Sequence, residues 1–421
     1  MTACRHCGAP LDAPVLDLGH APPCNALLAP EGLLRGETHL PLKLFLCETC
    51  GLAQIADHAG AEALFTADYV YRSSASRSWL AHAARFAREA TRRLGLGPGS
   101  QVVEIASNDG YLLRNFVAAG TPCLGIEPAA EPARAAREAG VPVLTAFFSE
   151  AVAESLRRGP MPRGADLVIG NNVFAHAPDI NDFARGLARL LAPEGVVSLE
   201  FPHVQRLVED GLFDTVYHEH FSYLSLTATS RIFSTAGLAV FDVEELPTHG
   251  GSLRVWGRPS SAAGARSGAV DAILAREARL GVARRTFYGG LQGAADRARD
   301  ALIAHLVDAR REGRRVAAYG AAAKGITLLN YARVGPDLLA YVCDAAASKQ
   351  GRLLPGCHIP VVAPERLRED PPDDLLILPW NLAEEIASDL DWLRRARGVR
   401  MMTLLPTPRA LPPAPSAKRI A

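Results

Sequence analysis

Two regions of the chain alternate short apolar runs with segments whose apolar residues recur at helical spacing. In the first region, helical segments such as 181–192 separate the earlier strand candidates, an order that predicts a mainly parallel sheet with helices on both faces. The last two candidates follow each other closely, so we expect a hairpin at one edge. Residues 79–97 predict a helix that stops at Gly95 and Gly97. The seven strand candidates are 101–107, 122–128, 142–146, 165–173, 195–202, 238–246 and 252–259.

From about residue 260 the sequence becomes rich in Ala and Arg, and residues 269–313 predict one or two long helices. The strand–turn–helix rhythm then returns, which predicts a second α/β domain. Prolines and small residues from position 407 predict an irregular tail. The segments that carry this second rhythm are 316–330, 339–345, 358–362, 374–380 and 401–406.

The N-terminal 60 residues contain two Cys-x-x-Cys-Gly knuckles, Cys4 to Cys7 and Cys47 to Cys50. The glycine of each knuckle lets the backbone turn so that its amides face the thiolates. Four thiolates are a common ligand set for structural zinc, and they leave no coordination position open for chemistry. The alternative is four unrelated buried cysteines. The remaining cysteines are isolated, and we expect them to be buried and inert: Cys24, Cys123, Cys343 and Cys357.

Composition narrows the class of partner. The 421 residues are 48% hydrophobic and carry 45 Lys+Arg against 45 Asp+Glu, so the formal net charge is zero. Such a chain lacks the positive field that nucleic acids and membrane surfaces attract, which favours a small-molecule partner. No apolar run approaches the roughly 20 residues of a membrane span, and MTACRHCGAP is not a secretory signal. We expect a cytoplasmic protein, where paired cysteines indicate metal before disulfides.

The first central strand ends in Glu104-Ile-Ala-Ser-Asn-Asp-Gly110, a turn of small residues where open parallel sheets place cofactors. It is neither a P-loop nor a Gly-x-Gly-x-x-Gly fingerprint. Glu127 follows about twenty residues on, where a carboxylate can bind both ribose hydroxyls. Together these features look like a class I S-adenosylmethionine site. A plain turn with a surface acid, or a nicotinamide dehydrogenase, are the alternatives. The expected cofactor contacts are Glu104, Ser107, Asn108, Gly110, Glu127, Asn171 and Asn172.

Two polar clusters follow the fourth and fifth strands. Asn171 and Asn172 lead to His176, which is well placed to line a pocket. The stretch VYHEHFSYLS, residues 216–225, can be interpreted as a metal site, an acid/base site or a polar surface patch. His218 and His220 stand at i and i+2, about 200° apart on a helix, whereas zincin histidines stand at i and i+4. This spacing argues against a catalytic metal.

In the second α/β region, Tyr319-Gly-Ala-Ala-Ala-Lys324-Gly joins a strand to a helix. Small residues there let backbone amides approach a pyrophosphate at the helix N-terminus, with Lys324 as a point charge. Asn330, one or two turns into the helix, is a weaker candidate for the same pocket. A tight turn with a solvated lysine is the alternative.

The combined motifs resemble those of S-adenosylmethionine-dependent sugar C-methyltransferases, which methylate a ring carbon of nucleotide-linked 4-keto-deoxysugars used in antibiotic and cell-surface sugars. The resemblance covers nearly the whole chain. One departure is Ala106, where the family usually has glycine. The motifs are the two knuckles, Tyr69-Val-Tyr71-Arg-Ser-Ser, Ser107-Asn-Asp-Gly110, Gly-Ile-Glu127-Pro, Asn171-Asn172-Val-x-Ala-His176, Tyr217-His-Glu-His220-Phe-Ser-Tyr, His249-Gly-Gly-Ser252 and Ala323-Lys324-Gly.

The resemblance implies an α/β architecture with three parts and a tail. A zinc-binding module would occupy residues 1–65 and a class I, Rossmann-like methyltransferase domain 66–260. A second Rossmann-like α/β domain at 261–410 would help hold the nucleotide sugar, and 411–421 would form the tail. The implied active-site set is Tyr71, His176, Tyr217, Glu219 and His220, and the implied substrate contacts are Lys324, Asn330 and Ser252.

The implied reaction is methyl transfer to C-3′ of a dTDP-linked 4-keto-deoxysugar in deoxysugar biosynthesis. Removing a proton beside the ketone gives an enolate, so the site needs a base and a partner for the enolate oxygen. His220 is our choice of base, because an imidazole of pKa near about 6.5 is substantially neutral at pH 7. Glu219 would orient a histidine or bind substrate, the two tyrosines would donate hydrogen bonds, and His176 would contact the ketone.

Three alternatives remain at this point. Methylation at C-5′ of a related nucleotide sugar would use the same residues. An NAD-dependent oxidoreductase acting on a nucleotide sugar would use the C-terminal α/β unit, and a scaffold protein would use its zinc knuckles to recruit a partner. We expect a monomer that binds neither nucleic acid nor membranes.

Overall fold

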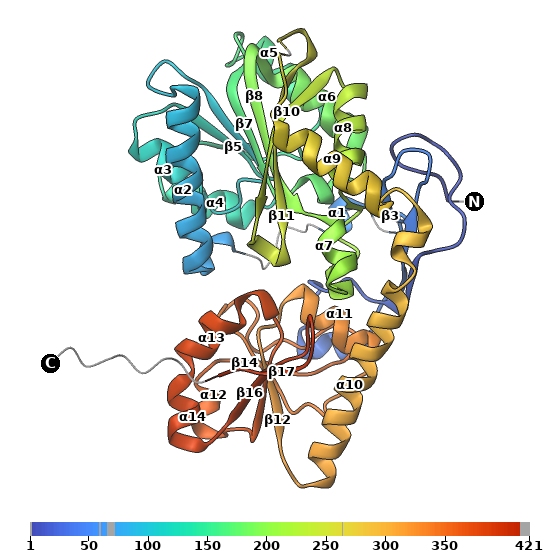
Figure 1. The fold of residues 1–421 in the computed structure, drawn as a ribbon. Coiled ribbons are helices and arrows are strands. Elements are labelled where there is room, and N and C mark those ends of the chain that lie inside the picture. Colours follow the sequence, from blue (N-terminus) through green and yellow to red (C-terminus); the bar gives the residue numbers. More distant parts are fainter. Residues whose placement is uncertain (1, 59, 65–71, 263, 413–421) are drawn as a thin grey trace, which may run out of the picture. The chain divides into compact units, whose positions relative to one another are not determined.

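The computed structural model describes residues 2–58, 60–64, 72–262 and 264–412 (Figure 1). Tyr71, one of the expected active-site residues, lies outside them. The chain forms two compact units, and both are discontinuous in sequence. The first comprises Met1–Pro14, Phe45–Gln205 and Glu219–Phe287, and the second comprises Val15–Leu44, Arg206–His218 and Tyr288–Ala421.

The first unit contains a seven-stranded sheet in the order β10-β11-β8-β7-β4-β5-β6. All strands run parallel except β11, which lies antiparallel between β8 and β10. The seven predicted strands and the hairpin are therefore confirmed. The bounds are β4 Val102–Ile105, β5 Cys123–Ile126, β6 Val143–Leu144, β7 Ala165–Asn171, β8 Leu191–Pro202, β10 Leu238–Leu246 and β11 Ser252–Pro259.

Helices cover both faces of this sheet (Figure 1). One face carries α2 (Arg77–Leu94), α3 (Leu113–Ala118) and α4 (Ala130–Glu138), whose apolar residues share one buried cluster with the sheet. The other face carries α5 (Glu150–Arg158), α6 (Ile180–Leu190), α8 (Leu226–Thr235) and α9 (Gly268–Leu280), which share a second cluster. The mainly parallel, two-faced sheet expected from the sequence is confirmed.

Helix α2 shows how local sequence sets these boundaries. The Ser76 side chain caps its N-terminus by accepting a hydrogen bond from the Trp79 amide at 3.2 Å. Gly95 ends the helix in the left-handed conformation at φ 62°, which glycine adopts without steric cost. The predicted stop is therefore confirmed at Gly95.

The zinc-knuckle part of the first unit adds the short strand β3 (Ala53–Ile55). It pairs antiparallel with β9 (Ser222–Tyr223), with Ala53 opposite Tyr223 and Gln54 opposite Ser222. The amide of Ile55 extends this ladder by donating to the Phe221 carbonyl at 3.1 Å. Residues 53–55 are thus hydrogen-bonded to residues 221–223, directly after His220. The short helix α1 (Ala61–Leu64) also belongs to this unit, and the short helix α7 (Val204–Glu209) follows β8.

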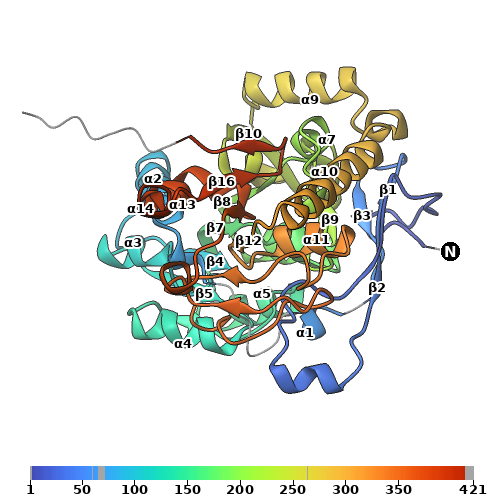
Figure 2. The ribbon, with the colours of Figure 1, turned by 90° about the horizontal axis from the view of Figure 1, so that it is seen from below.

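The second unit contains a six-stranded sheet in the order β14-β13-β12-β15-β16-β17, parallel except for β17. Figure 2 labels β12 and β16 of this sheet. The predicted second α/β domain is confirmed. The irregular tail expected from residue 407 is wrong for 409 and 410, which pair with β16. The strands are β12 Val316–Tyr319, β13 Val342–Cys343, β14 Val361–Val362, β15 Asp374–Ile377, β16 Arg400–Thr403 and β17 Arg409–Ala410.

Among the described residues, five α-helices accompany this sheet. An antiparallel strand pair from the N-terminal region also belongs to this unit, except for Phe45 and Leu46 at the end of its second strand. The helices are α10 Leu291–Arg311, α11 Ala323–Tyr331, α12 Arg366–Glu369, α13 Ala383–Asp389 and α14 Asp391–Arg397, and the strands are β1 Leu16–Ala21 and β2 Leu40–Leu46. Within the described residues, none of the helices combines the length and the hydrophobicity that a bilayer crossing requires.

The turn after β4 contains two non-glycine residues in the left-handed region, Ala106 at φ 54° and Asn108 at φ 49°. Asparagine tolerates this conformation, but alanine places its Cβ near the following carbonyl oxygen, which costs roughly 1–2 kcal/mol. A Cβ at Gly125 on the adjacent strand would lie 2.3 Å from Ser107 Oγ, so the turn also needs a glycine beside it.

We predict that Ala106→Gly stabilises the protein by about 1 kcal/mol, because glycine removes the steric cost of a positive φ. Urea unfolding measures the effect. Ala81→Gly is the matched control: Ala81 is exposed inside α2, where the same substitution costs about 1 kcal/mol. Equal destabilisation by both substitutions would contradict the strain assigned to Ala106.

Candidate active site

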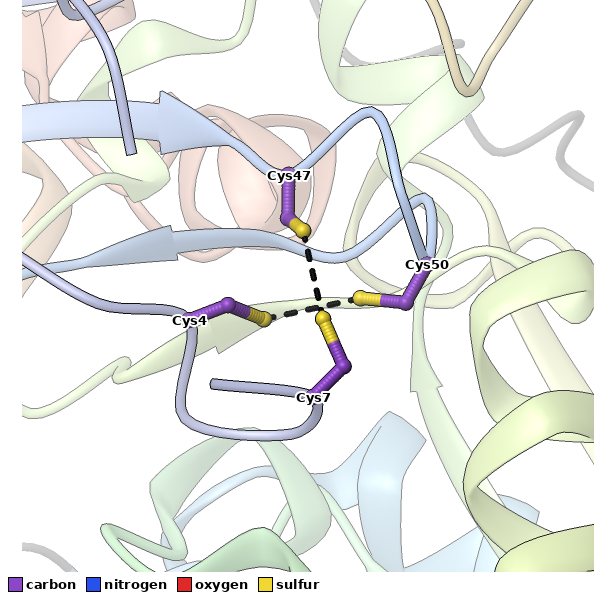
Figure 3. Close-up of side chains that lie close together, drawn as sticks. All are labelled: Cys4, Cys7, Cys47 and Cys50. Atoms are coloured by element: carbon purple, nitrogen blue, oxygen red, sulfur yellow. Dashed lines mark hydrogen bonds between the residues drawn. The ribbon is translucent and has the colours of Figure 1, made fainter. Parts of the chain in front are cut away.

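The two knuckles bring four sulfur atoms together (Figure 3). The Sγ atoms of Cys4, Cys7, Cys47 and Cys50 all lie within 4.8 Å of one another, with Cys4 to Cys50 and Cys7 to Cys47 both at 3.5 Å. A tetrahedral zinc with Zn–S distances of about 2.3 Å requires S–S distances of about 3.8 Å. The cluster therefore fits zinc, and its four ligands complete the coordination shell.

The histidines of the 216–225 stretch form no comparable cluster. Among the described residues, the four cysteines are the only group of three or more possible ligands close enough to hold a metal ion. This finding agrees with the spacing argument against a zincin site. The other four cysteines are buried, as expected, and burial raises the pKa of Cys343 and Cys357 to about 12.

The turn after β4 and the end of β7 lie at the carboxyl edge of the first sheet. Several buried polar atoms there have no hydrogen-bond partner within the part of the chain that the structure describes: Ser107 Oγ, Asp109 Oδ1, Asn172 Oδ1 and both amide atoms of Asn171. An unpaired buried polar group costs about 1–3 kcal/mol. A polar ligand such as S-adenosylmethionine, with its ribose, amino and carboxylate groups, can supply those partners.

Two buried carboxyl groups line the same edge. Glu127 accepts from the Asn108 amide and the Ala129 amide, both at 2.9 Å, so one side chain ties the β4 turn to the end of β5. Burial raises the pKa of Glu127, although these two amides oppose the shift. Burial also raises the pKa of Glu104 well above its usual value. Each carboxylate oxygen of Glu127 keeps a second acceptor position for a ribose hydroxyl.

Three of the expected catalytic residues meet in the first unit. His176 ends a 3₁₀ turn (Phe174–His176) after β7, and its Nδ1 lies 2.7 Å from the Glu219 carbonyl. The ring centroids of His176 and His220 lie 4.6 Å apart in an edge-to-face arrangement, and Tyr223 lies 6.1 Å from His220. The loops after the fourth and fifth strands therefore present a pair of imidazoles.

The contact with Glu219 defines the chemistry of His176. A carbonyl only accepts, so Nδ1 carries the proton and Nε2 of the neutral ring is an acceptor. Burial lowers the pKa of His176 to about 4, and the bond to the Glu219 carbonyl partly opposes the shift. The ring is thus neutral at physiological pH. The Glu219 contribution seen here comes from its main chain, which the sequence could not reveal.

Tyr217 is half-buried and belongs to the second unit, as does the buried His218. The motif of Tyr71 is described from Arg72 onwards. The Ser73 amide donates to Asn108 Oδ1 at 2.9 Å, and Ser74 donates to Asp109 through both its amide and its hydroxyl. This part of the motif is therefore held against the β4 turn.

A buried hydrogen-bond network around Glu200, beside the sheet edge, was not predicted from the sequence. Glu200 lies 2.8 Å from His82 Nε2 and accepts from Arg254 at 2.7 Å and from the Thr248 hydroxyl at 2.9 Å. Burial acts to raise the pKa of Glu200, but His82 and Arg254 outweigh it and hold the pKa below its usual value. The network fixes the turn that carries His249.

His249 stands at φ 53°, with Nε2 at 3.1 Å from Asn172 Nδ2. Its ring lies 5.2 Å from Trp79, which also stacks on His82 at 5.0 Å. In the sequence analysis His249 appears only in the motif His249-Gly-Gly-Ser252, and no role was predicted for its side chain. Ser252, expected to contact substrate, donates its hydroxyl to the Thr248 carbonyl at 2.9 Å and so closes the same turn.

In the second unit, Lys324 lies at the start of α11. Its Nζ donates to Asn381 at 3.1 Å and sits 4.2 Å from the Trp380 ring, while Trp380 Nε1 donates to Asp214 at 2.8 Å. Burial lowers the pKa of Lys324 to about 8, partly opposed by Asp214, and burial raises the pKa of Asp214 to about 6. Lys324 is not a simple solvated lysine.

Asn330 lies nearly two turns further along α11. Its amide nitrogen donates to the carbonyls of Ile326 and Pro355, both at 3.0 Å. These bonds hold the 355–357 turn against the helix and leave the side-chain oxygen as an acceptor.

We predict that Cys47→Ser lowers zinc content well below about one ion per chain and lowers thermal stability, because three thiolates and a hydroxyl bind zinc less tightly. Elemental analysis and thermal unfolding measure both effects. Cys24→Ser is the control, because Cys24 is a buried cysteine outside the cluster. Unchanged zinc in Cys47→Ser would contradict a four-thiolate site.

Comparisons with known proteins match this arrangement of parts. Family models described as a zinc binding domain, a methyltransferase domain and a C-methyltransferase C-terminal domain match residues 4–65, 79–243 and 247–406. C-methyltransferase NovU of Streptomyces niveus is 34% identical over 411 residues, which cover 97% of this chain and 96% of that protein.

Among solved structures, the PH0226 protein of Pyrococcus horikoshii is 13% identical with a TM-score of 0.36, covering 45% of this chain and 95% of that one. Magnesium protoporphyrin IX methyltransferase of Synechocystis with bound SAH is 14% identical with a TM-score of 0.34, covering 42% and 82%. The full-length match to NovU carries the assignment. The chain belongs to the family of S-adenosylmethionine-dependent C-methyltransferases with an N-terminal zinc-binding domain.

Proposed function

We propose that the enzyme transfers a methyl group to C-3′ of a dTDP-linked 4-keto-deoxysugar through an enolate, as a step in deoxysugar biosynthesis. The observation that carries the proposal is the imidazole pair, His176 with Nδ1 bonded to the Glu219 carbonyl and His220 packed at 4.6 Å. Carbon is methylated only once a carbanion equivalent exists, and a ketone provides one after a neighbouring proton is removed.

His220 acts as the general base in this proposal. It removes the C-3′ proton, and the electron pair of that C–H bond becomes the enolate π bond while charge develops on the ketone oxygen. When bound, S-adenosylmethionine supplies an electrophilic methyl sulfonium to the resulting nucleophilic carbon. Tyr71 and Tyr217 are proposed to donate hydrogen bonds to the sugar or to the enolate oxygen.

The neutrality of His176 suits this chemistry. Burial keeps the pKa of His176 near 4, so His176 adds no positive charge that would repel a sulfonium cation. Its Nε2 is an acceptor, which directs it toward a sugar hydroxyl, an amino group or a donor hydrogen on His220. The sequence analysis expected His176 to contact the ketone. In this tautomer Nε2 carries no proton and cannot donate a hydrogen bond to the ketone oxygen, so we assign that hydrogen bond to the tyrosines.

For the nucleotide, we propose contacts from Lys324 and Asn330. Lys324 combines a cation with an aromatic ring, Trp380, at 4.2 Å. A lysine with its pKa lowered to about 8 by burial is still protonated at pH 7 and gains from a phosphate partner. Asn330 keeps a side-chain oxygen available, whereas Ser252 is proposed to shape the turn that carries His249.

The alternatives differ in what they explain. Methylation at C-5′ would use the same groups and remains a variant of the proposal. An NAD-dependent oxidoreductase needs a carboxylate for ribose at the end of β13. There Asp344 Oδ2 already accepts from both the Ala321 amide and Lys349, and Oδ1 accepts from the Ala346 amide, whereas each oxygen of Glu127 accepts only one of the two amide bonds described for it. A scaffold role leaves the buried imidazole pair without a purpose.

Calorimetry separates the methyltransferase from the oxidoreductase. We expect saturable binding of S-adenosylhomocysteine and none of NADH, because the unpaired polar atoms lie at the β4 and β7 ends. Binding of NADH without S-adenosylhomocysteine would overturn the assignment of the cofactor.

We predict that His220→Asn abolishes both methyl transfer and exchange of the sugar C-3′ proton with solvent deuterium, because asparagine cannot accept that proton. NMR of the dTDP-linked 4-keto-sugar follows exchange, and S-adenosylhomocysteine binding shows that the fold survives. His249→Asn is the matched control and should retain exchange. Exchange at the normal rate in His220→Asn would mean that another residue is the base.

A further inference from the structure

The first zinc knuckle contacts both loops that carry the imidazole pair. Between its two cysteine ligands stand Arg5 and His6. The guanidinium of Arg5 donates from one nitrogen to the Pro178 carbonyl at 2.7 Å. Pro178 follows His176 by two residues, so the knuckle is bonded to the loop that holds that imidazole.

The same guanidinium reaches the loop of His220. Its second terminal nitrogen donates to the Ile55 carbonyl at 2.7 Å and to Asp57 at 2.6 Å, and its central carbon lies 5.3 Å from the centroid of the Phe221 ring. Phe221 is adjacent to His220, and its carbonyl accepts from the Ile55 amide. Only 6% of the Arg5 side chain is exposed. One buried cation therefore links both loops.

Contacts to the cysteine ligands fix the position of this arginine. Gln54 donates to Cys4 Sγ at 3.1 Å and accepts from the Arg5 amide at 2.9 Å. Asn181, at the start of α6, donates to the His6 carbonyl at 2.9 Å and lies 2.7 Å from His6 Nδ1. The turn between the two thiolates is thus held on its metal side by Gln54 and on its α6 side by Asn181.

We infer that Arg5 is a positioning residue, which transmits the rigidity of the zinc knuckle to the His176–His220 pair. The zinc-binding domain then has a role in catalysis without touching substrate. This inference rests on the proposed function for its effect on rate, but not for its effect on the geometry of the two rings.

The expected loss of catalytic rate without the Arg5 hydrogen bonds follows from how precisely the two imidazoles must be held. Catalytic groups must be held within a fraction of an ångström, and a misplacement of about 1 Å costs on the order of a hundredfold in rate. The bond between His176 and the Glu219 carbonyl is one direct connection between the two loops. Arg5 supplies further connections from Pro178 and Ile55, and without them the rings can move apart.

Arg5→Met tests the inference, because methionine keeps an apolar stem and removes every hydrogen bond of the guanidinium. Arg285→Met is the matched control. Arg285 also anchors the module by donating to two backbone carbonyls, those of Ala13 and Pro14, but it contacts neither histidine loop. Arg5→Lys keeps the charge and one donor group.

Holoenzyme with ring-labelled histidine is measured by NMR in the presence of S-adenosylhomocysteine. We expect the cross-ring nuclear Overhauser effect between His176 and His220 to persist in wild type and Arg285→Met and to be lost in Arg5→Met. Zinc content and S-adenosylhomocysteine affinity should be unchanged. With a dTDP-linked 4-keto-deoxysugar, kcat of Arg5→Met should fall between about tenfold and a hundredfold at constant KM, and Arg5→Lys should recover part of it.

The outcomes are distinguishable. An intact cross-ring effect with normal kcat in Arg5→Met would overturn the inference and leave the proposed function standing. Equal losses in Arg5→Met and Arg285→Met would also overturn it, because the arginine would then serve only general stability. If wild type does not methylate the sugar, the proposed function fails, and the cross-ring comparison still decides the role of Arg5.

Discussion

The hydrogen bond from His176 Nδ1 to the Glu219 carbonyl, 2.7 Å long, is the contact on which the site depends. It joins the loop after the fourth strand to the loop after the fifth and sets the tautomer of the imidazole. Because the acceptor is a main-chain carbonyl, its position is determined by the path of the backbone. The pairing of β9 with β3 determines that path directly after His220.

This dependence gives a reason why the metal site and the proposed reaction centre occur in one chain. The four thiolates need no substrate, and the imidazoles need no metal. Both lie on short loop segments. Buried hydrogen bonds from Arg5 and Gln54 connect the two, and we infer that these bonds pass the rigidity of the metal site on to the imidazole pair.

Much of the fold was predictable because the spacing of apolar residues distinguishes strands from helices, and turn residues such as glycine mark where these elements end. The seven central strands are short, apolar and separated by helical segments, and α2 ends at Gly95 as its left-handed φ requires. The four cysteines were predictable from spacing alone. The strands β3 and β9 were not, because their pairing joins residues far apart in sequence. The strand β17 was taken for tail because its two residues lie among prolines.

Sequence reasoning singled out a set of candidate site residues but not their arrangement. Motif order singled out His176 and His220, but their edge-to-face contact and the use of the Glu219 main chain are properties of the folded backbone. The roles of Arg5 and Glu200 could not be predicted from the sequence. An arginine between two cysteines, or a glutamate in a strand, matches no motif, and only the folded structure shows its hydrogen-bond partners. Ser252 and Asn330 illustrate the reverse: motif residues whose hydrogen bonds go largely to their own backbone.

The central claim is that the paired imidazoles border the place where the sugar reacts. A crystal structure with S-adenosylhomocysteine and thymidine diphosphate bound together measures this directly, because the space between the two ligands outlines the sugar. The account predicts that His176 and His220 line that space, with the ring of His220 nearest the position of the transferred methyl. Finding both rings outside it, with other side chains between the ligands, would contradict the account.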